Sequence, residues 1–418
     1  MKPPRVLAMI LAGGKGSRME MLTQVRPKPT LPFAGVYRLI DFPLSNCVQS
    51  RISDVWIVEQ FLPYSLNKYL AGGRPWDLDR TYGGLQIIQP HQGPNEEGFH
   101  QGNADALYRN RDIIRDFGPE LLLVLSADHV YKLDYSQVIA QHLDHNADVT
   151  MVVTQVPLES ATRFGNVEFD ADGKVTDFAY KPDEPQSEWV TTEVFVYSAD
   201  TLLDTLEELV AAKEKQNGDE EAALEDFGHE LIPHLVKKGK AYAFQFDGYW
   251  RDVGTIESYW EGHMDLLAAH PDLDLDDERW PILTYGVQRM PAHIHKSATI
   301  DNSLISPGCV VEGEVINSVL SPGVIVRKGA KVRNAVVLND VQIEANATVE
   351  YAIIDRRATI GKGATVGKAQ RAKQKKIALV GQDARVPAKA TVPADGRVDA
   401  ATDEDAFADT KEQVEAGR

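Results

Sequence analysis

The first part of the chain alternates short apolar runs with longer stretches of helical spacing. The apolar runs are rich in leucine and β-branched residues and lie at residues 6–11, 55–58, 121–125 and 149–153. Nearly continuous apolar runs of this length suit strands that are covered on both faces of a sheet. Strands that alternate with helices indicate an α/β sheet with right-handed crossovers. Ligands of such sheets bind beyond the carboxyl ends of the strands, so we look just after residues 11 and 125.

One helix is predicted in detail between two of these strands. Asn103 is a favourable N-cap residue, and the helical spacing continues through Leu107, Ile114 and Phe117. The sequence Gly118-Pro119 then provides a stop signal. We therefore expect one helix from Asn103 to Phe117.

A different periodicity begins near residue 292. A small residue, then Thr or Lys, then Val or Ile recurs at residues 298, 330, 347, 358, 364 and 390, and Ser-Pro-Gly occurs at 306–308 and 321–323. A six-residue unit with one buried aliphatic residue indicates a hexapeptide β-helix, whose coils need stacked neighbours to bury their apolar face. The alternative is a β-sandwich of short strands, but sandwiches do not repeat one tripeptide.

The change of periodicity suggests how the chain is divided. We expect a first domain over residues 1–262, a linker over 263–285 and a left-handed β-helix over 286–395. The segment 396–418 is rich in Ala, Asp and Glu and has little to bury, so we expect a disordered acidic tail.

Composition narrows the functional classes. The 418 residues include 44 Lys and Arg and 62 Asp and Glu, so the formal charge is 44 − 62 = −18. A chain this acidic is not expected to bind nucleic acid. No apolar run approaches the roughly 18 residues of a membrane helix, so no membrane partner is expected. Cys47 and Cys309 lie far apart and form no disulfide framework, which fits the cytoplasm.

A glycine-rich loop follows the first predicted strand. The strand ends in Leu11 and Ala12 and continues as Gly13-Gly14-Lys15-Gly16-Ser17-Arg18, a loop that lets backbone N–H groups approach a phosphate. Its spacing matches neither a Walker loop nor a dinucleotide fingerprint, and taken alone it could be a structural turn. Arg18, Arg26 and Lys28 follow within eleven residues, which favours a triphosphate site.

Four ordered motifs then carry a resemblance that covers the chain to about residue 392. They are residues 11–18 with Arg26-Pro27-Lys28-Pro29, residues 37–47, Ala127-Asp128-His129-Val130-Tyr131, and residues 249–255. This sequence resembles the sugar-nucleotide pyrophosphorylases, and most closely their ADP-glucose branch. The resemblance implies a Rossmann-like nucleotidyltransferase domain with a mixed sheet, followed by a left-handed β-helix of hexapeptide repeats.

The resemblance also implies a reaction and its residues. A hexose 1-phosphate would attack the α-phosphorus of ATP, with glucose 1-phosphate as the expected sugar, and pyrophosphate would leave. Asp128 and Asp252 would hold Mg²⁺, while Arg18, Lys28 and Asp128 would be catalytic. A capping or turn role for Asp128 and an ion pair of Asp252 with Arg251 are the structural alternatives. The resemblance assigns nucleotide binding to Leu11, Ala12, Gly13, Gly14, Gly16, Gln60, Gln92 and Gly102, and sugar-phosphate binding to Gly165, Tyr180, Lys181, Thr192 and Glu193.

The departures from the family pattern cluster at the expected sugar site. Tyr180 stands where the family has Glu before its lysine, and Thr191-Thr192-Glu193 replaces Ser-Met-Gly. Asn103 stands in place of a family threonine. A tyrosine cannot accept hydrogen bonds from sugar hydroxyls as a carboxylate does. Either Glu193 has taken over the carboxylate role, or the enzyme uses another hexose phosphate, or the chain is a weakly active regulatory subunit.

Two further alternatives and the partners complete the expectations. The chemistry could use another base, or the β-helix could belong to an acyltransferase, although His293 and His295 lie only at its start. Arg38 and Arg51 are candidates for binding anionic metabolite effectors, since Val36 replaces an activator-binding lysine of some family members. The family resemblance further implies a homotetramer.

Overall fold

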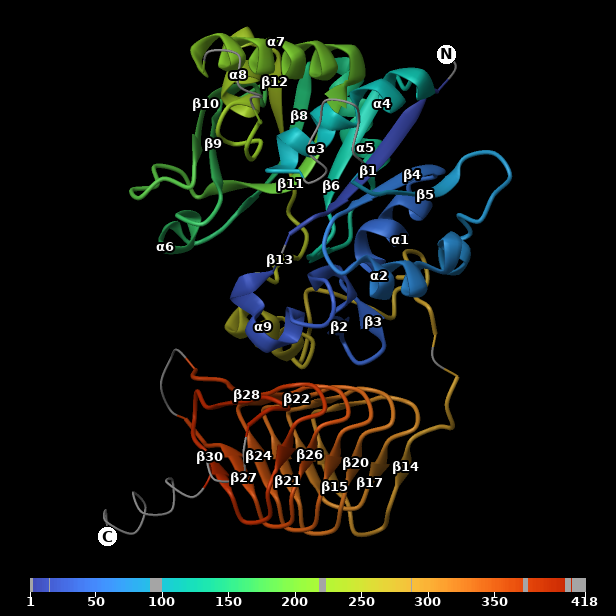
Figure 1. The fold of residues 1–418 in the computed structure, drawn as a ribbon, viewed down its shortest axis with the longest axis vertical. Helices are drawn as coiled ribbons and strands as arrows, with labels where there is room; N and C mark the ends of the chain where they lie inside the picture. The colour runs from blue at the N-terminus through green and yellow to red at the C-terminus, as the bar shows by residue number, and fades with distance from the viewer. Residues whose placement is uncertain are drawn as a thin grey trace. The chain divides into compact units, whose positions relative to one another are not determined.

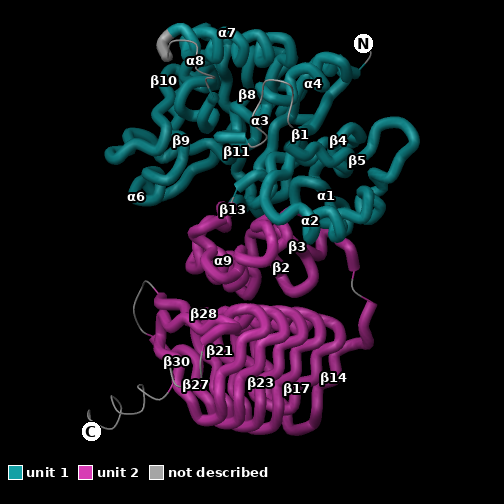
Figure 2. The backbone as a smooth tube through the Cα atoms, viewed as in Figure 1, with its two compact units in different colours: residues 1–14, 42–250, 278–283 teal, residues 15–41, 251–277, 284–418 magenta. Residues whose placement is uncertain are grey.

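The computed structural model describes residues 3–14, 16–90, 100–217, 223–286, 288–370, 375–402 and 407. The chain forms two compact units, each of which is discontinuous in sequence (Figure 2). Unit 1 comprises Met1–Gly14, Phe42–Trp250 and Glu278–Leu283, and unit 2 comprises Lys15–Asp41, Arg251–Asp277 and Thr284–Arg418. Among the described residues, no helix combines the length and apolar character needed to cross a membrane.

Unit 1 is built on a mixed sheet of nine strands within the described residues (Figure 1). The main path runs β10-β9-β11-β6-β1-β4-β5, and β8 pairs with both β11 and β12. β6, β1, β4 and β5 are parallel neighbours, whereas β11 runs antiparallel to β6 and to β8. The strands are β1 (Val6–Ala12), β4 (Asp54–Glu59), β5 (Gly84–Ile88), β6 (Leu121–Ser126), β8 (Val149–Gln155), β9 (Gly165–Phe169), β10 (Val175–Tyr180), β11 (Trp189–Ser198) and β12 (Ala241–Gln245). The apolar runs predicted as strands thus form β1, β4, β6 and β8, and the α/β fold with a mixed sheet is confirmed.

Helices cover both faces of this sheet. One apolar core joins α3, α4, α7 and α8 to alternate residues of the central strands, such as Leu7, Met9 and Val124. α5 lies on the opposite face, where His142 contacts Thr150, a neighbour in β8 of the core residues Val149 and Met151. The helices of the chain are α1 (Asp41–Gln49), α2 (Pro63–Leu70), α3 (Asn103–Arg109), α4 (Arg111–Phe117), α5 (Tyr135–Asp144), α6 (Leu158–Ala161), α7 (Ala199–Asn217), α8 (Leu231–Lys238) and α9 (Ile256–Asp265), with 3-10 helices η1 (Ser17–Thr23), η2 (Lys28–Thr30) and η3 (Ala71–Trp76). Four short strands precede the β-helix in sequence, β2 (Pro32–Phe33), β3 (Tyr37–Arg38), β7 (His129–Tyr131) and β13 (Trp250–Asp252). Of these elements, α9, η1, η2, β2 and β3 belong to unit 2.

The helix predicted from Asn103 to Phe117 is wrong in two respects. It is two helices, α3 and α4, which meet at Asn110, because the Asn110 amide donates to the Ala106 carbonyl (2.7 Å) and its backbone leaves the helical region. Gly102 rather than Asn103 is the N-cap residue. The stop signal is correct, since Gly118 caps α4 with a left-handed φ of 65°.

Most of unit 2 is a left-handed β-helix built from three parallel six-stranded sheets (Figure 1). The predicted tripeptides at 298, 330, 347, 364 and 390 stack in one sheet, and the one at 358 lies in a neighbouring sheet. The hexapeptide prediction is therefore confirmed and the β-sandwich alternative is wrong. The three sheets contain β14 (His293–Ile294), β17 (Val310–Val311), β20 (Ile325–Val326), β23 (Gln342–Ile343), β26 (Thr359–Ile360) and β29 (Arg385–Val386); β15 (Thr299–Asp301), β18 (Glu314–Ile316), β21 (Lys331–Arg333), β24 (Thr348–Glu350), β27 (Thr365–Gly367) and β30 (Thr391–Val392); and β16 (Leu304–Ile305), β19 (Val319–Leu320), β22 (Val336–Val337), β25 (Ala352–Ile354), β28 (Ala378–Val380) and β31 (Arg397–Val398).

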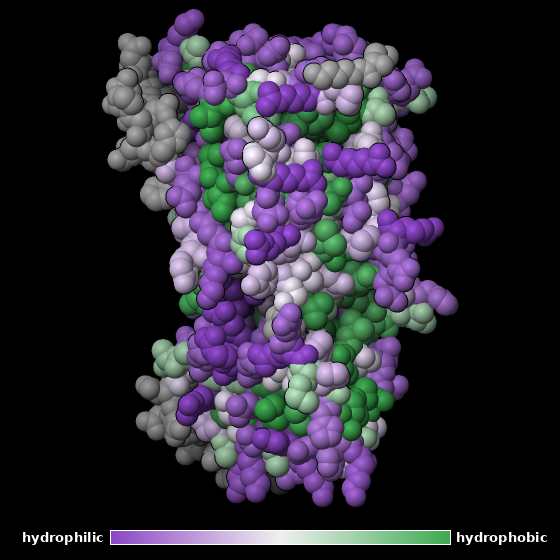
Figure 3. All heavy atoms as spheres, turned by 90° about the vertical axis from the view of Figure 1, so that its right-hand side faces the viewer, coloured by the Kyte–Doolittle hydropathy of each residue, from purple (hydrophilic) through white to green (hydrophobic). Residues whose placement is uncertain are grey.

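The β-helix core is a stack of aliphatic side chains, and its first coil is open. Val315, Val332, Val349 and Val366 pair in register along one sheet and are fully buried. In the first coil, by contrast, Ile294 and Leu304 are exposed, and Met290 before it is 79% exposed. Figure 3 views the chain from the side on which β14 lies, and hydrophobic side chains gather in its lower part.

Candidate active site

The glycine loop leaves unit 1 directly after β1. Leu11 and Ala12 end that strand, and Gly13 and Gly14 follow it. A Cβ added to Gly13 would lie 3.9 Å from Gln60, whereas one added to Gly14 would meet nothing within 4 Å. The backbone at Gly14 is exposed, so an anion can approach its N–H group.

Two residues predicted to bind the nucleotide, Gln60 and Gly102, make close contacts in the structure. The Gln60 amide accepts from the His100 N–H (2.7 Å) and donates to the His100 carbonyl (3.0 Å). Gly102 packs so closely on the backbone of Glu225 that a Cβ would lie 2.3 Å from its carbonyl carbon. Gln92 lies outside the described residues. Gln60 and Gly102 therefore both hold the segment that leads into α3.

Unit 2 contains the cationic half of the predicted nucleotide motif. Gly16 has a left-handed φ of 65°, and a Cβ there would lie 3.0 Å from the Thr23 side chain and 3.5 Å from Lys28. Lys28 is 8% exposed, and its Nζ lies 3.5 Å from Oδ1 of Asp252. Arg18 lies exposed on η1. Gly16, Lys28 and Asp252, three of the predicted residues, are thus close together.

Asp128 lies just beyond the carboxyl end of β6. The Ser126 hydroxyl donates to its Oδ1 (2.6 Å), and the side chain remains 23% exposed. His129 is nearly buried, with its Nε2 3.7 Å from Oδ1 of Asp128 and its Nδ1 3.0 Å from the Thr192 carbonyl. The Asp128 carboxylate is therefore fixed in orientation and open to an ion.

Both predicted metal ligands have the chemistry that a hard divalent cation requires. Asp128 belongs to unit 1 and Asp252 to unit 2, and each presents carboxylate oxygens, which are the ligands that Mg²⁺ prefers. Arg251 forms ion pairs with Glu261 and Asp265, while Asp252 faces Lys28. No group of three or more His, Cys, Asp or Glu that could hold a metal occurs among the described residues. Water and phosphate oxygens would therefore supply most of the ligands, as is usual for Mg²⁺.

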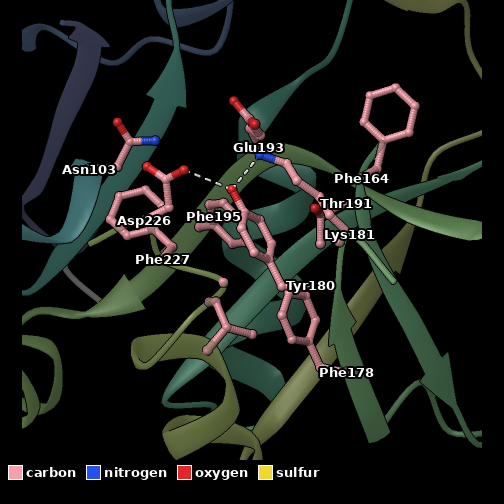
Figure 4. A pocket seen from close by; sticks show the side chains of 13 residues that line it. Asn103, Phe164, Phe178, Tyr180, Lys181, Thr191, Glu193, Phe195, Asp226 and Phe227 are labelled. Atoms are coloured by element: carbon pink, nitrogen blue, oxygen red, sulfur yellow. Dashed lines mark hydrogen bonds between the residues drawn. The ribbon is translucent and has the colours of Figure 1, made fainter. Parts of the chain in front are cut away.

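A pocket in unit 1 collects most of the predicted sugar-site residues (Figure 4). The polar ends of Asp226, Tyr180 and Lys181 meet in it, and Phe178 lies on the opposite side of the Tyr180 ring. The lining residues are Asn103, Phe164, Gly165, Phe178, Tyr180, Lys181, Thr191, Glu193, Phe195, Asp226, Phe227, Gly228 and Ile232.

The Tyr180 hydroxyl links an acid and a base in this pocket. It donates to Oδ2 of Asp226 (2.8 Å) and accepts from Nζ of Lys181 (2.6 Å). Its ring packs on Gly228, where a Cβ would lie 1.9 Å away, and edge-on to His229 at 4.7 Å between centroids. Tyr180 is therefore held by both its ring and its hydroxyl.

Glu193 enters the pocket through an irregularity in β11. The pairing register of β11 with β8 shifts between Thr191 and Phe195, and Glu193 has a left-handed φ of 56°. Its carboxylate is 45% exposed and lies 3.9 Å from Nε2 of His129. A β-bulge re-aims side chains, and a non-glycine residue at this φ costs about 1 kcal/mol. Such strain beside a pocket points to a functional side chain.

Alternate residues of β11, which are Thr191, Glu193 and Phe195, line the pocket. Gly165 and Thr191 line it, and a Cβ on Gly165 would lie 3.0 Å from Oγ1 of Thr191. Thr192 does not, because it is buried and its hydroxyl donates to the Val152 carbonyl (3.1 Å). Asp226 lines the pocket although no sequence signal marks it, since it belongs to an acidic stretch that resembles solvated surface.

The two effector candidates lie in different units. Arg51 in unit 1 is exposed and has a left-handed φ of 60°. Arg38 in unit 2 donates to the Thr30 carbonyl, and the charges that act on Arg356 include Arg38, Arg26, Arg357 and Asp355. Burial, followed by the charge of Arg26, lowers the pKa of Arg356. The structure thus does not bring Arg38 and Arg51 together within one unit.

Comparisons with known proteins match both parts of the chain. Residues 7–269 match the family described as nucleotidyl transferase, and residues 290–386 match a GlmU-like C-terminal hexapeptide family. The two matches correspond to the α/β sheet with its flanking segments and to the β-helix.

Relatives named glucose-1-phosphate adenylyltransferase match most of the chain. The protein of Thermotoga neapolitana is 43% identical over 78% of this chain and 76% of its own length. That of Fervidobacterium nodosum is 38% identical over 84% of this chain and 82% of its own. That of Bacillus mycoides is 39% identical over 84% of this chain and 91% of its own.

Proposed function

The chain belongs to the nucleotidyl transferase family and, within it, to the glucose-1-phosphate adenylyltransferases, and on this premise we propose that it makes ADP-glucose for glycogen or a related glucan. The phosphate oxygen of glucose 1-phosphate attacks the α-phosphorus of ATP. The bond from that phosphorus to the bridging oxygen of the β-phosphate breaks, and pyrophosphate leaves. The observation that carries the proposal is the match over about four fifths of the chain to relatives of this name.

Charge neutralisation and alignment are the main tasks of the protein in this reaction, because both substrates are anions. Arg18 and Lys28 neutralise the leaving β- and γ-phosphates, and the loop from Leu11 to Gly16 approaches the phosphates with its backbone. Lys181 binds the sugar phosphate. One of its three N–H groups donates to the Tyr180 hydroxyl, which leaves two for the phosphate. Asp128 and Asp252 are the proposed metal ligands, and a bound Mg²⁺ would polarise the α-phosphate and organise the triphosphate.

Glu193 provides the acceptor for sugar hydroxyls in this proposal. Tyr180 already donates its single hydroxyl proton to Asp226, so it does not replace a carboxylate. Glu193 presents an exposed carboxylate in the same pocket, and holding it there requires a strained backbone. This arrangement favours retained sugar binding over a purely regulatory chain.

A substrate panel tests the activity. ATP, UTP, dTTP and GTP are each combined with glucose 1-phosphate and glucosamine 1-phosphate, and pyrophosphate release is measured. We expect ATP with glucose 1-phosphate to give the highest kcat/KM. If another pair of nucleotide and sugar phosphate had a kcat/KM ten times higher, that base or sugar would be the substrate. No turnover with any pair would contradict the enzymatic function.

The variant Glu193→Gln tests the sugar site. We expect the KM for the sugar phosphate to rise about tenfold, equivalent to about 1.4 kcal/mol, while the KM for ATP changes less than twofold. Glu168→Gln, on the exposed side of β9, is the matched control. Equal sugar-phosphate KM values for both variants would remove Glu193 from sugar recognition.

The remaining proposals concern the assembly and its surroundings. We propose a homotetramer with anionic metabolite effectors, supported by the open apolar coil at the start of the β-helix and by the arginines Arg38, Arg356 and Arg357, since the charges of Arg38 and Arg357 act on Arg356. We propose the cytoplasm as its compartment, where the free, buried thiols of Cys47 and Cys309 would remain reduced. Residues 1–262 remain our proposed catalytic domain, 263–285 the linker and 286–395 the β-helix domain. The expected acidic tail, 396–418, begins too early, because Arg397–Val398 form β31 of the β-helix and Val398 is buried. Most of the rest of this segment lies outside the described residues.

A further inference from the structure

The segment that carries Arg18 and Lys28 belongs to the same compact unit as the β-helix. Residues 15–41 cluster with unit 2, although they follow the first strand of the unit 1 sheet in sequence. The side chains of Arg26 and Asp355, 329 residues apart, join this segment to the β-helix. The cationic part of the proposed nucleotide site is therefore attached to the β-helix.

The attachment is a fully buried ion pair. Nη2 of Arg26 lies 2.6 Å from both carboxylate oxygens of Asp355, and Nε of Arg26 donates to the Leu22 carbonyl (3.1 Å). Arg26 is 2% exposed and Asp355 is 0% exposed. A buried charge pair of this kind is tolerated only when its polar atoms have partners, and here both oxygens of Asp355 and two nitrogens of Arg26 have them.

Asp355 is fixed from the β-helix side as well. It follows β25 directly, its N–H donates to the Val380 carbonyl (2.8 Å), and its Oδ1 accepts from the Arg356 N–H (2.6 Å). The charged groups around it include Arg26, Arg356 and Arg357. The Asp355 carboxylate therefore lies among positive charges. A change of its rotamer would leave the buried charge of Arg26 without a counter-ion.

A second contact lies close to Arg18. Glu20 forms an ion pair with Arg397 of β31, with an Nη2–Oε1 distance of 3.0 Å. Met21 packs so near the backbone of Gly381 that a Cβ there would lie 3.3 Å from its sulfur. Arg18 thus precedes one anchor by two residues, and Lys28 follows the Arg26 anchor by two residues.

The chain between Arg26 and Lys28 is stiff. Pro27 and Pro29 fix φ on both sides of Lys28, and the Thr30 hydroxyl donates to the Pro27 carbonyl (2.9 Å). Lys28 itself is nearly buried beside Asp252. A displacement at Arg26 is therefore passed to Lys28 rather than absorbed by the chain.

We propose that Arg26 and Asp355 are positioning residues through which the β-helix sets the place of Lys28 at the triphosphate. The inference rests on the proposed function for the identity of the ligand. A displacement of about 1 Å at a group that holds a reacting substrate can cost about 10²-fold in rate. The β-helix thereby takes part in nucleotide binding through a side chain that does not touch the nucleotide.

The first test is Asp355→Asn in the full chain. We expect the KM for ATP to rise at least tenfold while the KM for the sugar phosphate changes less than twofold. Asp383→Asn is the matched control, because it breaks the exposed ion pair with Arg357 on the β-helix. Equal KM values for ATP in both variants would overturn the proposal.

The second test separates position from stability. Arg26→Met combined with Asp355→Leu replaces the buried pair by apolar side chains, which commonly preserves or raises stability. We expect the Tm to return to the wild-type value or above it while the KM for ATP remains at least tenfold raised. Recovery of the ATP KM together with the Tm would show that the pair only stabilises the fold.

Hydrogen exchange gives a readout that does not need turnover. In Asp355→Asn, or in the double variant if the single variant does not fold, amides of residues 16–41 should exchange at least tenfold faster, while those of β6 remain unchanged. Unchanged exchange in 16–41 would overturn the proposed attachment. Failure of the substrate panel alone would contradict the function and leave this attachment intact.

Discussion

Two buried histidines show how single residues couple stability to pH. His263 of α9 packs between the rings of Phe33 and Tyr259, at 4.6 Å from each, and its Nδ1 donates to the Tyr259 carbonyl (2.8 Å). Its Nε2 has no partner among the described residues. Burial lowers the pKa of His263 to about 4, and burial does the same for His142 of α5.

We expect acid to destabilise the protein through His263. The unfolded histidine takes up a proton as the pH falls below about 6.5, whereas the folded one stays neutral down to about 4. The stabilisation is therefore complete above pH 6.5 and is lost as the pH falls through this window, by about 3 kcal/mol at most. Urea unfolding at pH 7, 6 and 5 measures this effect. The free energy of unfolding should fall less with decreasing pH in His263→Gln than in the wild type.

His270→Gln is the control for this prediction, because His270 is exposed and follows the same helix. It should keep the pH dependence of the wild type. An equal loss of stability in His263→Gln and the wild type would rule out the buried imidazole as its source.

At the residue scale, contiguous motifs were predictable and long-range pairs were not. The neighbourhood of Gly16 and Lys28 follows from a local motif, so spacing alone could suggest it. Asp226 meets Tyr180 across 46 residues, and no local pattern marks that hydrogen bond. The exclusion of Thr192 from the pocket follows strand alternation, which places Thr191, Glu193 and Phe195 on one face of β11 and Thr192 on the other.

At the scale of elements, an asparagine ladder runs along one corner of the β-helix. Asn302, Asn317 and Asn334 share a left-handed φ of 39°, 46° and 48°. The amide of Asn302 donates to Asn317 (2.9 Å), and that of Asn317 donates to Asn334 (2.7 Å). Asparagine tolerates this φ better than other residues with a Cβ, and it also links successive coils.

The variants Asn317→Ala and Asn317→Gly should separate these two contributions. Glycine loses only the ladder bonds, whereas alanine also adopts an unfavourable φ. We expect both to lower the free energy of unfolding, and alanine to lower it by about 1 kcal/mol more than glycine. Thermal unfolding monitored by circular dichroism measures the difference, and equal Tm values for the two variants would contradict the role given to φ.

The elements themselves were predictable where a pattern repeats. Strands β1, β4, β6 and β8 and the stacked tripeptides follow from runs and repeats that each element contains in full. The break between α3 and α4 does not, because it depends on one side chain, Asn110, bonding back to its own helix. Competition of this kind between side chain and backbone leaves the apolar periodicity unchanged.

At the scale of the whole molecule, the open first coil bears on the proposed self-association. Ile294→Asp should shift the protein to a smaller oligomer, because it places a charge on an exposed apolar coil end. Thr299→Asp, at an exposed polar position of the same coil, should leave the oligomer unchanged. Light scattering after size-exclusion chromatography measures both masses, and unchanged masses would contradict an interface at Ile294.

The grouping of the chain into units was the least predictable feature. The sequence suggests contiguous parts, since composition and periodicity change along the chain. In the folded protein, residues 16–41 and 251–277 instead belong with the β-helix. Such grouping rests on pairs like Arg26–Asp355, which are far apart in sequence and have no periodic signature.

The distance between these two residues also matters while the protein is being made. A ribosome that adds about 5–20 residues per second needs roughly 15 to 65 seconds to pass from Arg26 to Asp355, which lie 329 positions apart. Throughout that interval the nascent segment with Met21, which packs near Gly381 and is buried in the finished protein, lacks a coil that has not yet been synthesised. Chaperones that shield apolar stretches during translation should therefore raise the yield of this chain.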